Sequence, residues 1–419
     1  MLLFVALALA AKTGPPRVSL VSRSSAGAAA NGYSSVEGGG NAISGDGRVV
    51  AFFSQAANLP GGDGTTYQVY ARDMKTGKTR LMSAKANGDA ATSDVFGPAI
   101  SAGGRFVVFY GTGAGLPGAD GVHNQAWRHD RRSGATRLVS RDSGGAAGSG
   151  NSVYPSVSAD GRFVAFQSNS ANLPGGDGVN SFAYLRDMRK GRTILISRTA
   201  TGAPAFGTTY GQSVSADGRR VVFYSKDADL PGGDGSTNHS YLRDVLRGRT
   251  TLIDRTNGGA VANGIGFNPS ISANGRFVAF ESTATNLGAS FADEQLFLRD
   301  VARGKTILVS RTNSGQKANG DAYLGHPSAN GRMVAFEAEA TNLPGGNAAN
   351  ARIYVRDLTG RRTILLSRRN DGGPVDGYFD YPSISSDGRW ASFYGGVFSG
   401  PGLGGNPAFP NVFRAGPIR

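Results

Sequence analysis

Residues 155–166 read Pro-Ser-Val-Ser-Ala-Asp-Gly-Arg-Phe-Val-Ala-Phe, and this pattern decides the fold. Its Gly-Arg centre recurs seven times in the 419 residues, with the glycines at Gly47, Gly104, Gly161, Gly218, Gly275, Gly331 and Gly388. The successive steps are 57, 57, 57, 57, 56 and 57 residues. Self-similarity at a fixed period is typical of repeat architectures, so each copy is expected to form one structural unit.

Each copy contains four strand-like runs separated by turn residues. In the third copy they cover residues 155–158, 163–168, 182–186 and 193–197. The runs are about five residues long and rich in β-branched and aromatic side chains, as strands are. Asp160-Gly161 predicts a hairpin turn between the first two, because both residues tolerate positive φ. No segment shows a helical period, so almost no helix is expected.

Four short antiparallel strands, repeated seven times, predict an all-β protein with a single seven-bladed β-propeller over residues 17–419. The two ends of the chain indicate how the propeller closes. The seventh copy stops after its third strand, whereas residues 17–23 match the fourth strand of the other copies, for example residues 306–311. We therefore expect residues 17–23 to supply the outer strand of blade seven and to close the ring, which leaves only short sheet edges.

Composition excludes several classes of protein. The 64 glycines follow no triplet period, so they indicate many tight turns rather than collagen. Hydrophobic residues make up 39% of the chain and lie in short regular runs, which argues against disorder. The absence of cysteine excludes disulfides, thiolate metal sites and cysteine nucleophiles.

The N-terminus resembles a signal peptide. Residues 1–11 are almost entirely apolar but too few to span a bilayer, and Ala8-Leu9-Ala10 fits a small-x-small cleavage pattern. A positively charged segment before the apolar run is missing, so the alternative is a flexible or wrongly assigned N-terminus. We expect an exported protein, periplasmic, cell-surface or secreted, that does not span the membrane.

The repeat carries a family resemblance. The pattern Pro-Ser-Ile-Ser-Ala-Asp-Gly-Arg-Phe-Val-Ala-Phe, then Tyr-x-Arg-Asp, then Thr-Gly-Lys-Thr resembles the TolB-like, WD40-like (PD40-type) β-propeller repeats of exported bacterial proteins, over essentially all of residues 17–419. The resemblance implies a propeller that binds partner proteins of the cell envelope. TolB also has an α/β domain before its propeller, which this sequence does not contain, so we expect a similar interaction module rather than a component of the Tol system.

Repeated charged residues are assigned to the blades rather than to a site. Arg-Asp pairs recur in five copies, Arg72-Asp73, Arg186-Asp187, Arg243-Asp244, Arg299-Asp300 and Arg356-Asp357, with His129-Asp130 as a variant. A catalytic carboxylate would not be needed in every blade, whereas an aspartate that bonds turn amides would. The basic residues behind the net charge of +14 are spread evenly around the ring, and many have an aspartate beside them. Nucleic acid is therefore not the expected partner, and an anionic polymer of the cell wall or membrane is preferred.

The loop between the second and third strands is a candidate calcium site. It reads Leu-Pro-Gly-Gly-Asp or a close variant in the first four copies, which places Asp63, Asp120, Asp177 and Asp234 beside glycine. Calcium takes six to eight oxygen ligands. A second acid is missing from each loop, so the alternative is a structural Pro-Gly turn. Calcium is the one cofactor that the sequence suggests.

The four histidines, His123, His129, His239 and His326, occupy different repeat positions and form no metal-ligand spacing. Blade six departs most from the repeat, because Gly325-His326-Pro327 falls in its first strand and proline removes a ladder donor. We therefore expect a distorted inner strand there, with His326 and Pro327 as an irregular functional feature.

Aromatic residues recur where each copy enters its first strand. They form the candidate ligand-binding set Phe96, Tyr154, Tyr210, Phe267, Tyr323 and Tyr381, together with His326. Propeller geometry places them around the mouth of the central channel, where they would suit a peptide or glycan. The alternative is that the rings pack between blades.

The favoured function is an exported, monomeric, non-enzymatic propeller that binds a protein or polymer partner through its loop-rich face. The alternative is a carbohydrate-active lyase or glycosidase with its site at the channel mouth, since fold alone does not choose between them. An enzyme requires non-repeated carboxylates or histidines that converge there. The loosely suitable acids are Asp94, Glu294, Asp321, Asp376 and Asp380.

Overall fold

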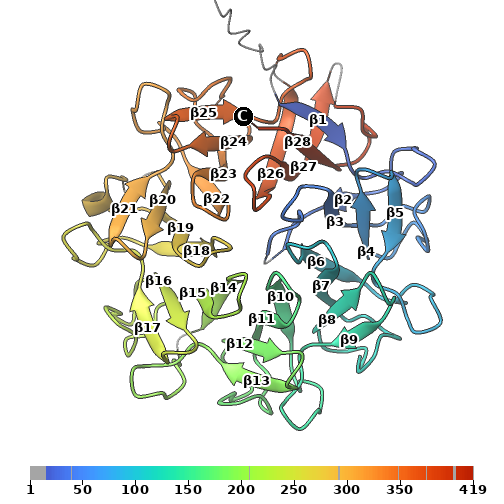
Figure 1. Cartoon of the computed structure of the whole chain (residues 1–419), viewed down its shortest axis with the longest axis horizontal. Helices are drawn as coiled ribbons and strands as arrows, with labels where there is room; N and C mark the ends of the chain where they lie inside the picture. Colours follow the sequence, from blue (N-terminus) through green and yellow to red (C-terminus); the bar gives the residue numbers. More distant parts are fainter. Residues whose placement is uncertain are drawn as a thin grey trace, which may run out of the picture.

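Seven four-stranded antiparallel sheets surround a central channel in the computed structural model, which confirms the predicted propeller (Figure 1). The structure describes residues 16–418, except 39, 207, 291, 292, 348, 374 and 400–402. The predicted signal peptide, residues 1–11, lies outside the described residues. The only helical element in the described part is the single 3-10 turn η1 (Thr285–Leu287).

Each blade runs from an inner strand at the channel to an outer strand at the circumference. The inner strands are β2 (Ser34–Ser35), β6 (Val95–Ile100), β10 (Ser152–Val157), β14 (Thr209–Val214), β18 (Gly266–Ile271), β22 (Ala322–Pro327) and β26 (Asp376–Ile384). The second strands are β3 (Val49–Ser54), β7 (Phe106–Gly111), β11 (Phe163–Ser168), β15 (Arg220–Ser225), β19 (Phe277–Ser282), β23 (Met333–Ala338) and β27 (Ala391–Ser399).

The third strands are β4 (Gln68–Asp73), β8 (Gln125–Asp130), β12 (Phe182–Asp187), β16 (His239–Asp244), β20 (Gln295–Asp300), β24 (Arg352–Asp357) and β28 (Asn411–Gly416). The outer strands are β5 (Lys78–Leu81), β9 (Thr136–Leu138), β13 (Arg192–Leu195), β17 (Arg249–Leu252), β21 (Lys305–Leu308), β25 (Arg362–Leu365) and β1 (Arg17–Leu20).

The ring closes through the N-terminal strand, as the repeat pattern predicts. Strand β1 pairs antiparallel with β28, from Arg17 opposite Gly416 to Leu20 opposite Phe413. The Val21 N–H extends the ladder to the Val412 carbonyl, at 2.7 Å. Blade seven is therefore built from both ends of the described chain (Figure 1).

The Asp-Gly-Arg turn joins the inner strand to the second strand with one glycine in the left-handed region. Gly161 has φ 72°, and a Cβ there would lie 2.0 Å from the Phe106 ring of the preceding blade. Only the glycine takes positive φ, whereas the sequence argument allowed it for both turn residues. The aspartate caps the turn instead, because Asp160 Oδ1 accepts hydrogen bonds from the Arg162 N–H and the Ser158 hydroxyl.

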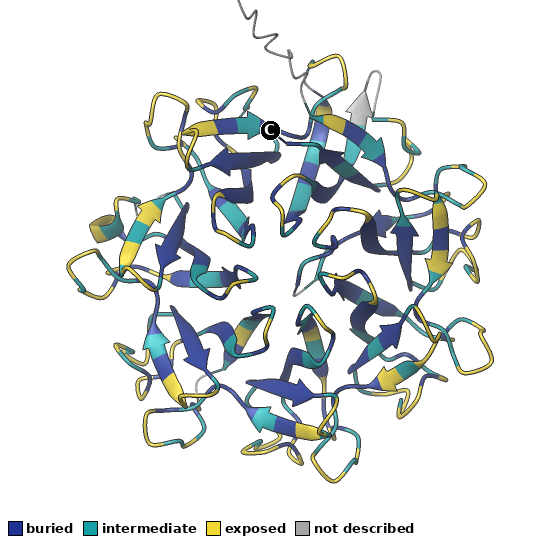
Figure 2. Ribbon diagram, viewed as in Figure 1, coloured by how far each residue is buried: buried dark blue, intermediate teal, exposed yellow. Residues whose placement is uncertain are grey.

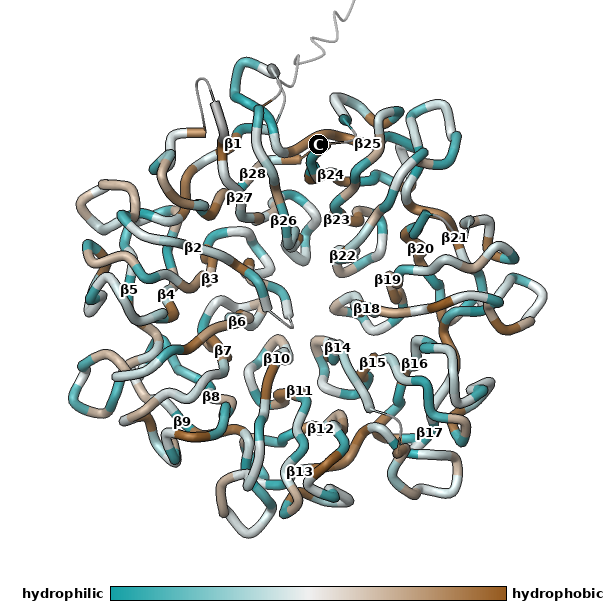
Figure 3. Tube along the Cα trace, turned by 180° about the vertical axis from the view of Figure 1, so that it is seen from behind, coloured by the Kyte–Doolittle hydropathy of each residue, from teal (hydrophilic) through white to brown (hydrophobic). Residues whose placement is uncertain are grey.

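The core consists of the middle strands packed face to face between blades. Figure 2 shows burial concentrated in these strands and exposure at the outer loops, and Figure 3 shows the hydrophobic stretches on the same strands from behind. An aromatic residue of the second strand stacks on one of the third, as in Phe166 on Tyr184 with ring centroids 5.7 Å apart. These pairs occupy one repeat position, so the periodic sequence produces a periodic core.

The repeated arginines and aspartates hold each blade together. Arg162 of the Asp-Gly-Arg turn forms a bidentate ion pair with Asp187, and the same carboxylate accepts amide hydrogen bonds from the next turn. The preceding Arg186 donates to Thr193 and to the Arg141 and Asp142 carbonyls of the previous blade. These contacts support the structural interpretation of the Arg-Asp repeats.

Candidate functional site

The face of the ring that carries the connections between blades differs most from blade to blade. The loops between second and third strands and the connections into each inner strand lie on this face, whereas the Asp-Gly-Arg turns lie on the opposite one, because the strands alternate in direction. We call the inner edge of the connection-bearing face the mouth. The variable residues of the inner and second strands meet there.

Six inner strands bend at the mouth through the same bulge. The ladder register shifts in blades two to seven, and one residue at each shift has φ between 45° and 63°. These residues are Gly97, Tyr154, Gly211, Asn268, Leu324 and Tyr381. The predicted aromatic set therefore spans two positions: Tyr154 and Tyr381 occupy the bulge, and Phe96, Tyr210, Phe267 and Tyr323 precede it.

Part of this set joins a continuous arc of aromatic rings. Neighbouring centroids are 5.3–6.4 Å apart along a path from blade seven through blades one and two to Tyr154 of blade three. The aromatic arc consists of Tyr378, Tyr381, Tyr394, Tyr33, Phe53, Tyr67, Phe96, Tyr110 and Tyr154. Tyr154 is 39% exposed at its end, so the arc is open to a partner.

The remaining predicted residues lie elsewhere on the mouth. Tyr210 and Phe267 both contact Tyr224 and form a separate, smaller group across blades four and five. Tyr323 donates a hydrogen bond to Asp321 at 3.0 Å. The structure thus brings Phe96, Tyr154 and Tyr381 into one arc, groups Tyr210 and Phe267 around Tyr224, and leaves Tyr323 apart.

Sequence reasoning missed one repeat position that builds much of the mouth. This position lies five residues after the arginine of the turn that joins the inner and second strands. In blades one to seven it is Phe53, Tyr110, Gln167, Tyr224, Glu281, Glu337 and Tyr394. Its change from aromatic to acidic is the strongest difference between the copies. Aligning the second strands, rather than the entry loops, would have found it.

The acidic members of this position connect neighbouring blades. Glu281 is 1% exposed and accepts hydrogen bonds from the Leu324 N–H at 2.6 Å and from Asn268 Nδ2 at 3.0 Å. Burial raises the pKa of Glu281 to about 8, although these donors oppose the shift. Glu337 is 5% exposed and accepts from the Tyr381 N–H at 3.4 Å. Each glutamate therefore holds the bulge of the following blade.

Glu337 and Asp380 form a carboxyl pair beside the aromatic arc. Burial, then the hydrogen bond to Asp380 and the charge of that group, raise the pKa of Glu337 well above its ordinary value. A hydrogen bond joins the two carboxyl groups, and the Tyr394 hydroxyl donates to Asp380 Oδ2 at 3.5 Å. Glu37 of blade one completes this group, because its Oε1 accepts from the Tyr381 hydroxyl at 3.3 Å.

Glu37 belongs to a segment that crosses the channel. Ser34 and Ser44 are ten positions apart, whereas the equivalent Val95 and Ser101 of blade two are six apart, so blade one carries four extra residues. A Cβ on Gly38 would lie 2.9 Å from the Gly97 backbone, and one on Gly40 2.7 Å from Ala99. We call residues 36–41, of which residue 39 lies outside the described part, the channel segment.

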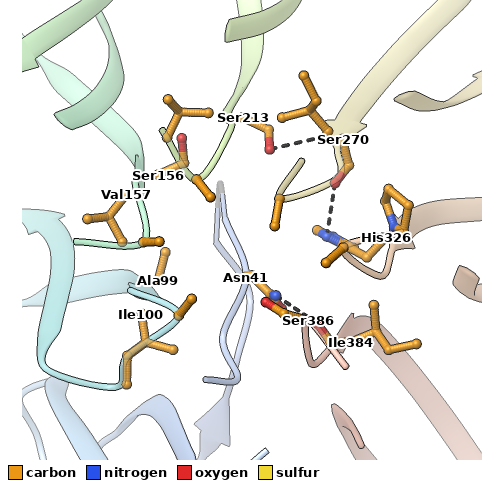
Figure 4. A pocket seen from close by; sticks show the side chains of 18 of the residues that line it. Asn41, Ala99, Ile100, Ser156, Val157, Ser213, Ser270, His326, Ile384 and Ser386 are labelled. Atoms are coloured by element: carbon orange, nitrogen blue, oxygen red, sulfur yellow. Dashed lines mark hydrogen bonds between the residues drawn. The ribbon is translucent and has the colours of Figure 1, made fainter. Parts of the chain in front are cut away.

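Beneath the channel segment lies a cavity of about 80 Å³, lined by Asn41 and Ile43 of blade one and by the inner strands of the other six blades. Figure 4 shows His326 and Asn41 pointing into it among small side chains such as Ser213 and Ser270. His326 Nδ1 is 3.2 Å from the Ser270 hydroxyl, and Asn41 donates to the Ile384 carbonyl at 2.7 Å. Burial lowers the pKa of His326 to about 4, so the ring is neutral at pH 7.

The prediction for blade six is therefore modified. The register shift in β22 between Tyr323 and His326 recurs in five other blades, so the bend is a property of the fold rather than of blade six. Pro327 pairs with Val334 within the ladder. His326 occupies the position of Ala99, Ser156, Ser213, Ser270 and Ser383, which makes it the exception in the channel wall rather than part of the mouth.

The four candidate calcium ligands cap their own loops. Asp63 accepts from the N–H groups of Thr65 and Thr66 and from the Thr66 hydroxyl. Asp120, Asp177 and Asp234 repeat this arrangement with Val122 and His123, Val179 and Asn180, and Ser236 and Thr237. Among the described residues, no three histidine, aspartate or glutamate side chains gather as a metal site. The geometry supports the structural Pro-Gly turn, and calcium binding stays a prediction.

Two of the loosely suitable acids also serve the backbone. Asp94 Oδ1 accepts from the Tyr67 N–H and Asp321 Oδ1 from the Glu294 N–H, at 2.8 and 2.7 Å. Burial raises the pKa of Glu294. Asp376 begins β26 at the edge of blade seven, away from the carboxyl pair. Of the five acids considered from the sequence, Asp380 alone lies in the group around Glu37.

Comparison with known proteins identifies the fold. No protein-family model matches the sequence, and no curated protein is similar enough to count as a relative. Solved structures with a similar fold include a putative TolB from Agrobacterium tumefaciens, with 16% identity, a TM-score of 0.45 and coverage of 83% of this chain and 97% of that one. Oligogalacturonate lyase from Vibrio parahaemolyticus is 10% identical with a TM-score of 0.57, covering 95% and 93%.

The β-propeller domain of the Trilobed protease from Pyrococcus furiosus is 11% identical, with a TM-score of 0.52 and coverage of 87% and 90%. The likenesses to the lyase and to the protease domain cover 95% and 87% of this chain and show the β-propeller fold. The similar structures include enzymes and a TolB protein at low identity, so they do not decide the function. Within the described residues, no helix is long and apolar enough to cross a membrane.

Proposed function

We propose that this propeller is a non-enzymatic binding module that holds a protein partner at its mouth. The observation that carries the proposal is the aromatic arc, which spans four consecutive blades and ends at the exposed Tyr154. Tyrosine is enriched at protein interfaces because it offers a large apolar ring with a polar tip. A mouth held rigid by blade-to-blade glutamates also limits the entropy lost on binding.

The acids beside the arc favour a partner segment with basic side chains. Glu37 and Asp380 lie among Tyr381, Tyr394 and Tyr33. Lysine or arginine placed there would meet both a carboxylate and the face of an aromatic ring, and each contact favours a cation. A basic peptide segment therefore fits the mouth better than an acidic one.

A double variant built from the protein's own repeats tests the proposal. Asn268 occupies the bulge position of Tyr154, and Val153 occupies the position of Tyr210, so Y154N/Y210V keeps residues that the fold already accepts. We expect wild type to bind members of a basic peptide library, and the double variant to lose about tenfold or more in affinity. Leu246→Ser, at an exposed turn on the opposite face, is the matched control. Equal binding by wild type, the double variant and the control would show that the peptide does not bind at the mouth.

A carbohydrate-active enzyme remains the second candidate because two non-repeated carboxyl groups, Glu337 and Asp380, do meet at the mouth. Glycosidases separate their carboxyls by roughly 5–9.5 Å to admit the sugar and water, whereas a hydrogen-bonded pair is closer. The pair therefore suits a blade contact better than glycoside hydrolysis. Release of reducing ends or unsaturated sugars from a polysaccharide panel, lost in D380N, would support the enzyme instead.

Export and a monomeric state belong to the same proposal. The apolar residues 1–11 and the binding face both fit a protein that meets its partner outside the cytoplasm. Fractionation of the native host should recover the protein outside the cytoplasm, and sedimentation should give the mass of one chain. Recovery with cytoplasmic markers would contradict the export part alone.

A further inference from the structure

A second surface lies at the circumference, where the outer strands leave cavities between blades. Four of them have the same construction: a proline-glycine pair from the loop between second and third strands, the outer strand, and the turn that follows it. Their volumes are about 660, 340, 450 and 870 Å³ in blades two, three, four and six. We call them the outer grooves.

Each outer groove is lined by basic side chains. In blades three, four and six an exposed arginine begins the outer strand, a buried leucine follows three residues later, and a half-buried arginine three residues after that. The arginine pairs are Arg192 and Arg198, Arg249 and Arg255, and Arg362 and Arg368. The groove of blade two instead has Arg137, Arg141, Arg186, Arg189 and Lys190.

Most of these charges are not neutralised. In blades one to six, the arginine of the turn between the inner and second strands has an aspartate partner, from Arg48 with Asp73 to Arg332 with Asp357. Within the described part of the chain, no ion pair engages the groove residues Arg137, Arg189, Arg192, Arg249 or Arg255. Among the described residues that line the grooves of blades two, three and four there is no aspartate or glutamate. The excess positive charge of the chain therefore gathers at the circumference.

We propose that the outer grooves of blades two, three and four bind successive charges of one flexible anionic polysaccharide chain. Guanidinium groups pair with carboxylates by two parallel hydrogen bonds, and the aliphatic walls, such as Leu195 and Pro204 in blade three, suit the apolar faces of sugar rings. Linked weak sites reinforce one another, so a polymer that spans consecutive blades binds more tightly than its fragments.

The groove walls favour a polysaccharide over nucleic acid. Single-stranded nucleic acid is held by aromatic side chains that stack on the bases. The walls of the four outer grooves contain proline, leucine, isoleucine, valine and methionine, but no aromatic residue among the lining side chains of the described chain. The aromatic arc lies instead at the mouth, so the propeller presents two chemically distinct surfaces.

The test uses alginate, a uronate polymer, with the full-length protein. Wild type is expected to bind it with an affinity that falls as salt rises, and long chains should bind at least about tenfold more tightly than alginate tetramers. The variant R137Q/R189Q/R192Q/R249Q removes exposed groove charges and should weaken binding about tenfold or more. The control K75Q/R132Q/K226Q/R303Q loses the same net charge from exposed positions outside the grooves and should change affinity less than about twofold.

Several outcomes would overturn the proposal. Equal weakening by the two quadruple variants would show that binding depends only on the net charge of the protein and not on the outer grooves. Equal affinity for tetramers and long chains would show that one chain does not bind several outer grooves at once. Tighter binding of single-stranded DNA than of alginate, at matched charge, would assign the grooves to nucleic acid. Thermal melting of both variants, expected to match wild type because the side chains are exposed, excludes misfolding as the cause.

Discussion

At the scale of single residues, equivalent positions show where this protein departs from its own repeat. The first residue of the third strand and a residue 15 positions later form a buried polar pair in several blades. Gln68 with Ser83, Gln125 with Ser140, and Gln295 with Ser310 make the same hydrogen bond at 2.5–2.8 Å. In blade four the pair becomes His239 and Asp254, with Nδ1 and Oδ2 2.6 Å apart and both side chains buried.

The protonation of this pair is linked to stability. Burial lowers the pKa of His239, but the hydrogen bond and charge of Asp254 outweigh it and leave the pKa raised. Burial likewise raises the pKa of Asp254 despite its bond to His239. Both folded-state values are above the unfolded ones, so the folded pair binds protons more tightly. Its contribution to stability is complete at low pH and is lost as pH rises through the raised pKa values.

The repeat supplies the variants that test this pair. His239→Gln alone leaves buried Asp254 without its partner and should cost about 3–5 kcal/mol of unfolding free energy. The double variant H239Q/D254S recreates the Gln–Ser pair of blades one, two and five, and should recover most of that loss. Denaturant titrations at pH 5 and pH 9 measure both effects. The advantage of wild type over the double variant should shrink at pH 9, and an unchanged or larger advantage would contradict the linkage.

At the scale of elements, the inner hairpins decide what the mouth can present. A bulge with positive φ bends six inner strands. The residue before the bulge pairs with a residue of the second strand, for example Phe96 with Tyr110 and Asp380 with Tyr394. Blade one replaces this bend with the channel segment, which contacts blades two, three and seven. The segment therefore fixes Glu37 beside the tyrosines and separates the mouth from the channel cavity.

The fit of the channel segment predicts an asymmetric response to adding a methyl group. A Cβ at Gly40 would lie 2.7 Å from the Ala99 Cβ and 3.1 Å from the Ser156 Cβ, whereas at Gly103 the nearest atom is the Ala159 carbonyl oxygen at 4.0 Å. Gly40→Ala should therefore destabilise the protein by about 1–3 kcal/mol, as overpacking does. Gly103→Ala should change stability by less than about 0.5 kcal/mol. Chemical denaturation measures the unfolding free energy of both variants. Equal unfolding free energies would show that the channel segment can shift to accommodate the methyl group.

At the scale of the whole molecule, closure of the ring depends on pairing the two ends of the chain. Strand β1 covers the edge of β28, and Val18 and Leu20 bury their side chains in the core between blades six and seven. Without β1, blade seven would expose an unpaired edge and part of that core.

Deleting residues 1–24 should lower the unfolding free energy by about 3–6 kcal/mol, from the burial of two large apolar side chains alone. Deleting residues 1–15 keeps the whole of β1 and should leave the melting temperature unchanged. Differential scanning calorimetry of the two truncations gives the comparison. If the protein that lacks residues 1–24 melted at the same temperature as wild type, the ring would close without β1.

The mouth and the outer grooves also belong to this scale, because each gathers side chains from several blades. An aromatic and acidic surface at one face and a basic surface at the circumference suit a scaffold that holds two partners at once. The mouth variant Y154N/Y210V should therefore weaken binding of a basic peptide but not of alginate. The groove variant R137Q/R189Q/R192Q/R249Q should weaken binding of alginate but not of the peptide.

The period of 57 residues was enough to predict seven blades, four strands in each, and closure by residues 17–23, because blade packing is local and repeats with the chain. The structural roles of the Arg-Asp pairs followed from the same periodicity. The arc through Tyr33, Tyr110 and Tyr394, the pairing of Glu337 with Asp380 and the channel position of His326 did not. These residues come from different blades, and only ring closure brings blade seven beside blade one. The periodic sequence by itself determined the scaffold. Only the tertiary structure decided which of the residues that differ between the repeats come into contact.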